Sequence, residues 1–143
     1  MKKTLLNIVA ITLMGLAFTA CSDDKTASPT IVLTEVGHDD SHIAYTGSDM
    51  HLEADIEAEG LIKTIHVELL LEEGSGYRIA KEWADGKYIG KKNTEFHEHI
   101  DIPSDAPEGE YQLLFTVADR EGNQSQATAH VVVMEPETEP TVE

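Results

Sequence analysis

The chain has 143 residues, of which 27 are Asp or Glu and 10 are Lys or Arg, and its formal net charge at pH 7 is −17. So acidic a chain repels phosphate backbones and anionic lipid head groups, which excludes nucleic-acid binding and membrane attachment through a basic patch. Its length suits one domain with its own core and is too short for two. With one cysteine it cannot form an internal disulfide, so cohesion must come from an apolar core.

The first twenty residues predict a secretory signal peptide. Met1-Lys2-Lys3 is cationic, the stretch from Leu5 to Phe18 is largely apolar, and small residues precede Cys21. The apolar stretch is too short to span a bilayer comfortably, and its charged start and small-residue end are those of a cleaved leader. Residues 1–20 contain two lysines and no acid, so their removal changes the formal charge from −17 to −19.

The cysteine directly after this leader resembles the lipobox cysteine of bacterial lipoproteins. That resemblance implies that Cys21 becomes the acylated N-terminus, and that residues 21–29 form a lipidated tether to a membrane. Ser22-Asp23-Asp24 resembles the acidic export signal of Bacteroidota-type surface lipoproteins, which implies a surface-exposed lipoprotein of the outer membrane. The alternative is that these residues are only the solvated start of a linker.

Short segments of alternating polarity follow one another to the end of the chain. In residues 50–58, for example, Leu52, Ala54 and Ile56 share one face, as in a half-buried strand. Turn residues separate the segments, and none shows helical periodicity. The predicted strands are 30–36, 50–58, 62–72, 77–83, 95–102, 110–118 and 126–134. Residues 37–49 are expected to be mostly loop, and residues 135–143 an acidic disordered tail. We therefore predict an all-β, Ig-like antiparallel sandwich of about seven strands over residues 30–134.

Two sets of motifs carry a resemblance. The turn from Pro103 to Tyr111 and the later Asp119…Gly122-Asn123 hairpin resemble the late strands of bacterial Ig-like domains. Three further stretches are similar to an uncharacterised family of small Bacteroidota lipoproteins with a single Ig-like domain of unknown function. They are Gly37-His38-Asp39, Asp49 to Ala54 and Phe96 to Pro103. This resemblance implies a fold and a location, but no activity.

Seven histidines follow the leader, and their spacing suggests a metal site. His97 and His99 are two residues apart, so both rings project from one face of a strand. In an Ig-like order the second and fifth strands are antiparallel neighbours, which places His51 beside His99 and near the loop before residue 50. The candidate ligands are His38, His42, His51, His97, His99 and Asp101. Histidine and carboxylate donors without a thiolate suit zinc, copper(II), nickel or iron(II). The alternative is that these histidines are scattered, solvated positions on outer strand faces.

Other chemistry finds less support in the sequence. The chain has no Gly-x-Ser-x-Gly elbow, no phosphate-binding glycine loop and no second cysteine, so we expect it not to be an enzyme. Tyr77, Trp83 and Tyr88 form either a stacking platform for a sugar or peptide or the rim of the core. Asp119 and Asn123 are expected to cap a turn rather than to bind calcium.

Two functional hypotheses follow. The first is a lipid-anchored, non-enzymatic Ig-like binding module of the cell envelope, which engages another envelope protein or an extracellular ligand. The second is a lipoprotein that binds zinc, copper or iron through its histidines and serves an outer-membrane transporter.

Overall fold

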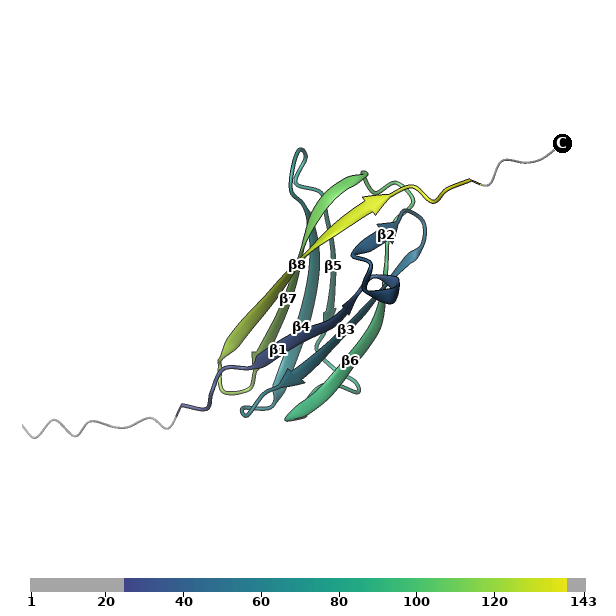
Figure 1. The fold of residues 1–143 in the computed structure, drawn as a ribbon. Helices are drawn as coiled ribbons and strands as arrows, with labels where there is room; N and C mark the ends of the chain where they lie inside the picture. The colour runs from purple at the N-terminus through teal and green to yellow at the C-terminus, as the bar shows by residue number, and fades with distance from the viewer. Residues whose placement is uncertain (1–24, 139–143) are drawn as a thin grey trace, which may run out of the picture.

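The computed structural model describes residues 25–138, which form eight strands and one short 3₁₀ helix. Sheet A contains β1 (Thr30–Val36), β3 (Asp49–Glu57) and β6 (Asn93–Asp101). Sheet B contains β2 (Ile43–Tyr45), β4 (Ile62–Leu71), β5 (Arg78–Trp83), β7 (Gly109–Asp119) and β8 (Gln124–Met134). The helix, η1 (His38–Asp40), follows β1. The all-β, Ig-like sandwich predicted from the sequence is confirmed (Figure 1).

The pairing of strands brings distant parts of the chain together. Sheet A has the order β1-β3-β6, and both of its ladders are antiparallel. Sheet B has the order β2-β8-β7-β4-β5, in which the short β2 pairs with β8 in parallel. In sheet A, β3 and β6 pair without a register shift from Asp49 opposite Asp101 to Glu57 opposite Asn93. This ladder fixes which side chains of the two strands face each other.

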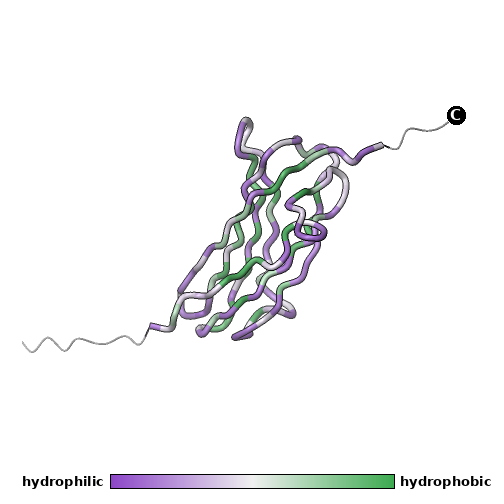
Figure 2. The backbone as a smooth tube through the Cα atoms, in the orientation of Figure 1, coloured by the Kyte–Doolittle hydropathy of each residue, from purple (hydrophilic) through white to green (hydrophobic). Residues whose placement is uncertain are grey.

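The core lies between the sheets and is built by alternation along each strand. Leu52, Leu69, Leu113 and Phe115 are fully buried. Hydrophobic positions alternate with hydrophilic ones along the strands, while hydrophilic residues dominate most of the turns (Figure 2). Among residues 25–138, no helix is long and apolar enough to cross a membrane. Burial of the apolar side chains between the sheets supplies the cohesion of the domain, since a chain with one cysteine has no internal disulfide.

Two local features depart from the sequence prediction. The segment 37–49, expected to be mostly loop, contains η1 and the eighth strand, β2. In β1 the register shifts between Leu33 and Glu35, as in a β-bulge. Strict alternation would place Glu35 on the same side as Leu33. The shift instead pairs Glu35 with Glu53 on the outer face and buries Val36.

The N-terminal segment of the described chain is attached to one end of the sandwich. The side-chain amide of Asn123 donates to the hydroxyl of Thr26 at 2.9 Å, and the Ala27 N–H donates to a Glu59 carboxylate at 3.3 Å. The predicted signal peptide (residues 1–20), Cys21 and the last residues of the predicted tail lie outside the described residues. Thr26 and Ala27 therefore lie beside the β3–β4 and β7–β8 turns (Figure 1).

Candidate metal site

Three of the predicted histidines form a cluster on the outer face of sheet A. His51 lies opposite His99 in the β3–β6 ladder. His97 precedes His99 by two residues and lies on the same face of β6. The His51 ring centroid is 4.6 Å from that of His97 and 5.1 Å from that of His99. One ring nitrogen of each histidine lies within 4.8 Å of the others, so the three could hold one metal ion.

The backbone brings these side chains close. The hydroxyl of Tyr88 lies 3.1 Å from the His97 N–H nitrogen and 2.9 Å from the His97 carbonyl oxygen. Because these two groups bond to Tyr88, they point away from β3, and Glu53–His97 is a non-hydrogen-bonded pair. The His51–His99 pair, two residues along the ladder, is of the same kind. Side chains in such pairs approach one another more closely than in hydrogen-bonded pairs.

Each ring of the cluster has a carboxylate at its Nδ1 atom. Glu35 Oε1 lies 3.1 Å from Nδ1 of His51, and Glu53 Oε1 lies 2.8 Å from Nδ1 of His97. Asp49 contacts Nδ1 of His99. Of these three contacts, the one between Glu35 and His51 is a hydrogen bond. A carboxylate that accepts a hydrogen bond from one ring nitrogen leaves the other nitrogen free to bind a metal, which is the arrangement common around protein metal sites.

The central histidine has one nitrogen without a hydrogen bond. Nε2 of His51 is buried and has no hydrogen-bond partner, although Glu53 Oε1 lies 3.2 Å away. If Nδ1 of His51 carries the ring proton and donates it in a hydrogen bond to Glu35, a lone pair on Nε2 faces the negatively charged Glu53 oxygen. That contact becomes favourable when a proton or a metal cation lies between them.

The charges around the cluster also favour a cation. Acidic residues face one another across the strands three times, in the pairs Asp49–Asp101, Asp55–Glu95 and Glu35–Glu53. Like charges in direct cross-strand pairs are destabilising. None of the three strands of sheet A contains a lysine or arginine that would offset them. A bound cation would offset the repulsion between these acidic side chains.

The other predicted ligands lie elsewhere. His38 is exposed and contacts Asp39, while Nδ1 of His42 lies 2.9 Å from the His130 carbonyl oxygen. Asp101 is exposed and pairs with Asp49 across the ladder. Within residues 25–138, no group of three potential ligands includes His38, His42 or Asp101.

Three carboxylates of the site, those of Glu35, Asp49 and Glu53, were not among the predicted ligands. Glu53 alternates with Leu52 and Ala54, which share the inner face of the strand, so its position beside His51 and His97 follows from the alternation together with the predicted strand order. Glu35 had no such signal, because only the bulge in β1 turns it toward His51.

Tyr88 and Glu98 support β6 from its inner side. Burial raises the pKa of Tyr88. Burial also acts to raise the pKa of Glu98, but hydrogen bonds from Lys87 and Tyr88 outweigh it, and the net result is a lowered pKa. Lys87 Nζ lies 2.9 Å from a Glu98 oxygen. Glu98 is therefore an ionised partner of Lys87 and Tyr88, and it faces away from the histidines.

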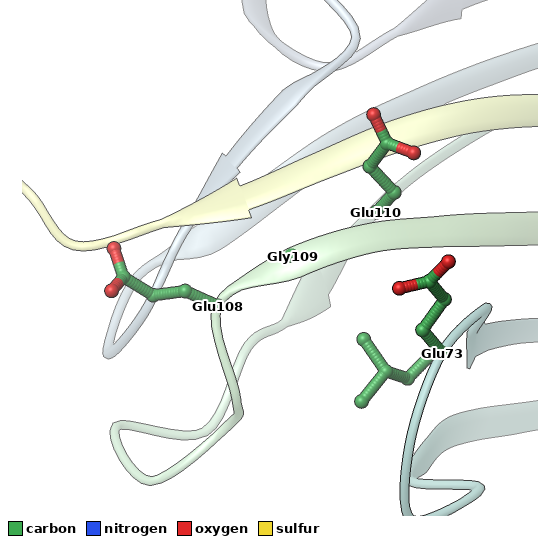
Figure 3. A pocket seen from close by; sticks show the side chains of 5 residues that line it. Glu73, Glu108, Gly109 and Glu110 are labelled. Carbon is green, nitrogen blue, oxygen red and sulfur yellow. The ribbon is translucent and has the colours of Figure 1, made fainter.

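Glu35, His51 and Glu53 form a second group of potential ligands, which shares His51 with the cluster, and a third group lies on sheet B. His130 Nε2 is 3.7 Å from Glu110 and 4.0 Å from Glu72, and all three side chains are exposed. Glu110 also lines a hollow with Glu73 and Glu108, whose carboxylates surround the Gly109 end of β7 (Figure 3). This group has only one histidine and no buried nitrogen without a partner, so it is the weaker candidate.

The aromatic residues and the Asp119 hairpin have structural roles. Trp83 and Tyr88 both pack against Phe96, with ring centroids 4.9 and 5.0 Å apart, and so form the rim of the core rather than a free platform. Asp119 accepts hydrogen bonds from the N–H groups of Glu121 and Asn123, as expected for a turn cap.

The comparisons with known proteins identify a family and a fold. Residues 19–134 match the family described as "Domain of unknown function (DUF4625)", and the chain belongs to this family. Two similar solved structures are crystal structures of OgpA from Akkermansia muciniphila: the wild type, and a catalytically inactive form in complex with an O-glycopeptide (glycodrosocin) substrate. Each is 14% identical with a TM-score of 0.52, and the match covers 73% of this chain but only 28% of OgpA. This likeness shows the fold alone. No curated protein matches the sequence.

Proposed function

We propose that this protein is a non-enzymatic, lipid-anchored binding module of the cell envelope whose ligand is a transition-metal cation, held by His51, His97 and His99. The single observation that carries the proposal is the buried Nε2 atom of His51. It has no hydrogen-bond partner and belongs to a ring that lies next to two other imidazoles. The facing acidic pairs of sheet A add a second reason for a cation at this place.

The donor set indicates the class of metal. Imidazole nitrogens with nearby carboxylate oxygens and no thiolate suit zinc, copper(II), nickel or iron(II) better than copper(I), calcium or magnesium. His97 and His99 are more than half exposed, at 58% and 55% of their side-chain surface. A metal bound here stays open to solvent, which suits capture and transfer more than a purely structural role.

The place of the site in the domain fits attachment through Cys21. The described N-terminal segment joins the sandwich beside Glu59, at the far end of β3 from His51. The seven residues from His51 to Glu57 span about 20 Å of extended strand. A domain anchored by a lipid on Cys21 would thus hold the metal away from the membrane, where an outer-membrane transporter or another envelope protein can reach it.

Calorimetric titration with zinc and with copper(II) tests the proposal. It uses the unlipidated mature chain, defined as residues 21–143 with Cys21→Ser and no histidine tag. We expect one tight equivalent of metal, lost in the His97→Ala/His99→Ala variant and retained in His66→Ala, whose histidine lies on β4 in sheet B. Weak binding of several ions that is unchanged in the double variant would refute the proposal.

The second candidate is the same anchored module without a metal, engaging an envelope protein or an extracellular ligand. What favours it is the edge strand β5, whose Ala80, Lys81 and Glu82 are exposed, since such an edge accepts an added peptide strand. This candidate gains support if the titration finds no site at the histidines, and its test is then cross-linking on intact cells.

A further inference from the structure

We infer that Glu53 supplies a fourth ligand to the metal and that Glu35 positions His51 to receive it. This inference rests on the proposed function of the His51, His97 and His99 cluster. It adds two residues with different roles: Glu53 contacts the metal, while Glu35 acts only through His51.

Glu35 is held in place by the chain that follows it. Its Oε1 atom accepts a hydrogen bond from the Asp39 N–H at 3.0 Å and lies 3.1 Å from Nδ1 of His51. The Asp39 N–H faces it because η1 follows β1 directly. Asp39 and Asp40 have φ angles of 53° and 54°, a left-handed conformation that is unusual for residues other than glycine. Such backbone persists only where the surroundings hold it, as around binding sites.

The contact with Glu35 selects one tautomer of His51. A carboxylate accepts hydrogen bonds and donates none when ionised, so Nδ1 of His51 must carry the proton. Nε2 is then the free donor, and it is the buried nitrogen without a partner. Glu35 thus determines which nitrogen of His51 is offered to the metal and which way the ring is turned.

Glu53 lies where a ligand next to His51 would lie. In a tetrahedral zinc site with bonds of about 2.0–2.1 Å, two ligand atoms are about 3.3 Å apart. Glu53 Oε1 is 3.2 Å from Nε2 of His51, without the geometry of a hydrogen bond. The same oxygen lies 2.8 Å from Nδ1 of His97, so when Oε1 binds the metal the contact with His97 passes to the second carboxylate oxygen of Glu53. With the three histidines this gives three nitrogens and one oxygen.

Zinc titration of the unlipidated mature chain separates the two roles. We expect Glu35→Ala to weaken zinc binding about 10–100-fold, the usual effect of removing a residue that orients a ligand. Glu35→Gln, which keeps an acceptor oxygen, should recover part of this loss. Glu53→Gln should weaken zinc binding by at least as large a factor as Glu35→Ala. The matched control is Glu57→Gln, the same charge change on the outer face of β3 but far from the histidines.

A second measurement does not depend on metal. Two-bond ¹H–¹⁵N correlation spectra of the metal-free chain at pH 8 report which ring nitrogen is protonated. We expect His51 to carry its proton on Nδ1 in the wild type and to become a mixture of tautomers in Glu35→Ala. A proton on Nε2 of His51 in the wild type, or unchanged zinc affinity in both Glu35→Ala and Glu53→Gln, would overturn the inference. If the wild type binds no zinc at all, the proposed function fails, whereas the spectra still decide the role of Glu35.

Discussion

Replacement of Asp119 by alanine should destabilise the domain more than any change at an exposed acid. The carboxylate is 1% exposed. Its Oδ1 accepts from the N–H groups of Glu121 at 3.0 Å and Asn123 at 2.8 Å, and its Oδ2 accepts from the Asn123 side chain at 2.8 Å. The same Asn123 amide reaches Thr26, so Asp119 also fixes the place where the N-terminal segment joins the sandwich.

The expected loss follows from these three bonds. A hydrogen bond to a charged group contributes about 1.5–3 kcal/mol, and the alanine variant leaves the partly buried N–H groups of Glu121 and Asn123 without this acceptor. Relief of the desolvation of the carboxylate offsets part of this loss. We therefore expect Asp119→Ala to lower the free energy of unfolding by about 3–5 kcal/mol, a large fraction of the about 5–15 kcal/mol typical of a domain.

Urea unfolding followed by circular dichroism measures this quantity. The matched control is Asp105→Ala, which removes an exposed aspartate from a turn and should change stability by less than about 0.5 kcal/mol. A loss below about 1 kcal/mol for Asp119→Ala would show that the three hydrogen bonds do not stabilise the hairpin, and would refute the reasoning.

The same residue predicts a pH dependence. Burial acts to raise the pKa of Asp119, but hydrogen bonds from Asn123 and Glu121 outweigh it and hold the pKa below its ordinary value. A depressed carboxyl pKa contributes stability that is fully present above the unfolded value of about 3.9 and is lost as the pH falls through the folded pKa. The wild type should therefore lose stability below about pH 4 more steeply than Asp119→Asn. Equal slopes would contradict this assignment.

Three further predictions concern β6, the η1 turn and the anchor. Tyr88→Phe removes the hydroxyl that bonds to the His97 backbone and Glu98, and should cost about 1–3 kcal/mol in urea unfolding. Gly37→Ala places a Cβ 2.9 Å from the Ile43 carbonyl oxygen at a φ of +78°, so it should lower the unfolding free energy by about 2 kcal/mol and weaken zinc binding through Glu35. Cys21→Ser should move the full-length protein from the membrane to the soluble fraction of fractionated cells, and its retention in the membrane would contradict lipidation.

The sequence was sufficient for the fold and for part of the site because β3 and β6 alternate without interruption. Clean alternation assigns faces, and the Ig-like order predicts the neighbour, so the meeting of His51 with His99 followed from residues alone. The bounds of the seven predicted strands agree with those of the structure to within two residues, because alternation shows where each strand begins and ends.

The rest could not be predicted because it depends on breaks in alternation. The bulge at Thr34 turns Glu35 outward, and nothing in the sequence of β1 indicates it. The three-residue strand β2 is too short to show a period, and it forms because β8 offers a parallel partner. His38 is exposed to solvent and His42 contacts the His130 carbonyl oxygen, so three of the five candidate histidines form the cluster.

X-ray absorption at the zinc edge, recorded on the one-to-one complex of the unlipidated mature chain, tests the central claim most directly. The account predicts a first shell at about 2.0–2.1 Å, with multiple-scattering features of three imidazoles that fall to one imidazole or none in the His97→Ala/His99→Ala variant. A shell of oxygen atoms without imidazole features, unchanged in that variant, would show that zinc binds only the acidic surface. The histidine cluster would then not be a metal site.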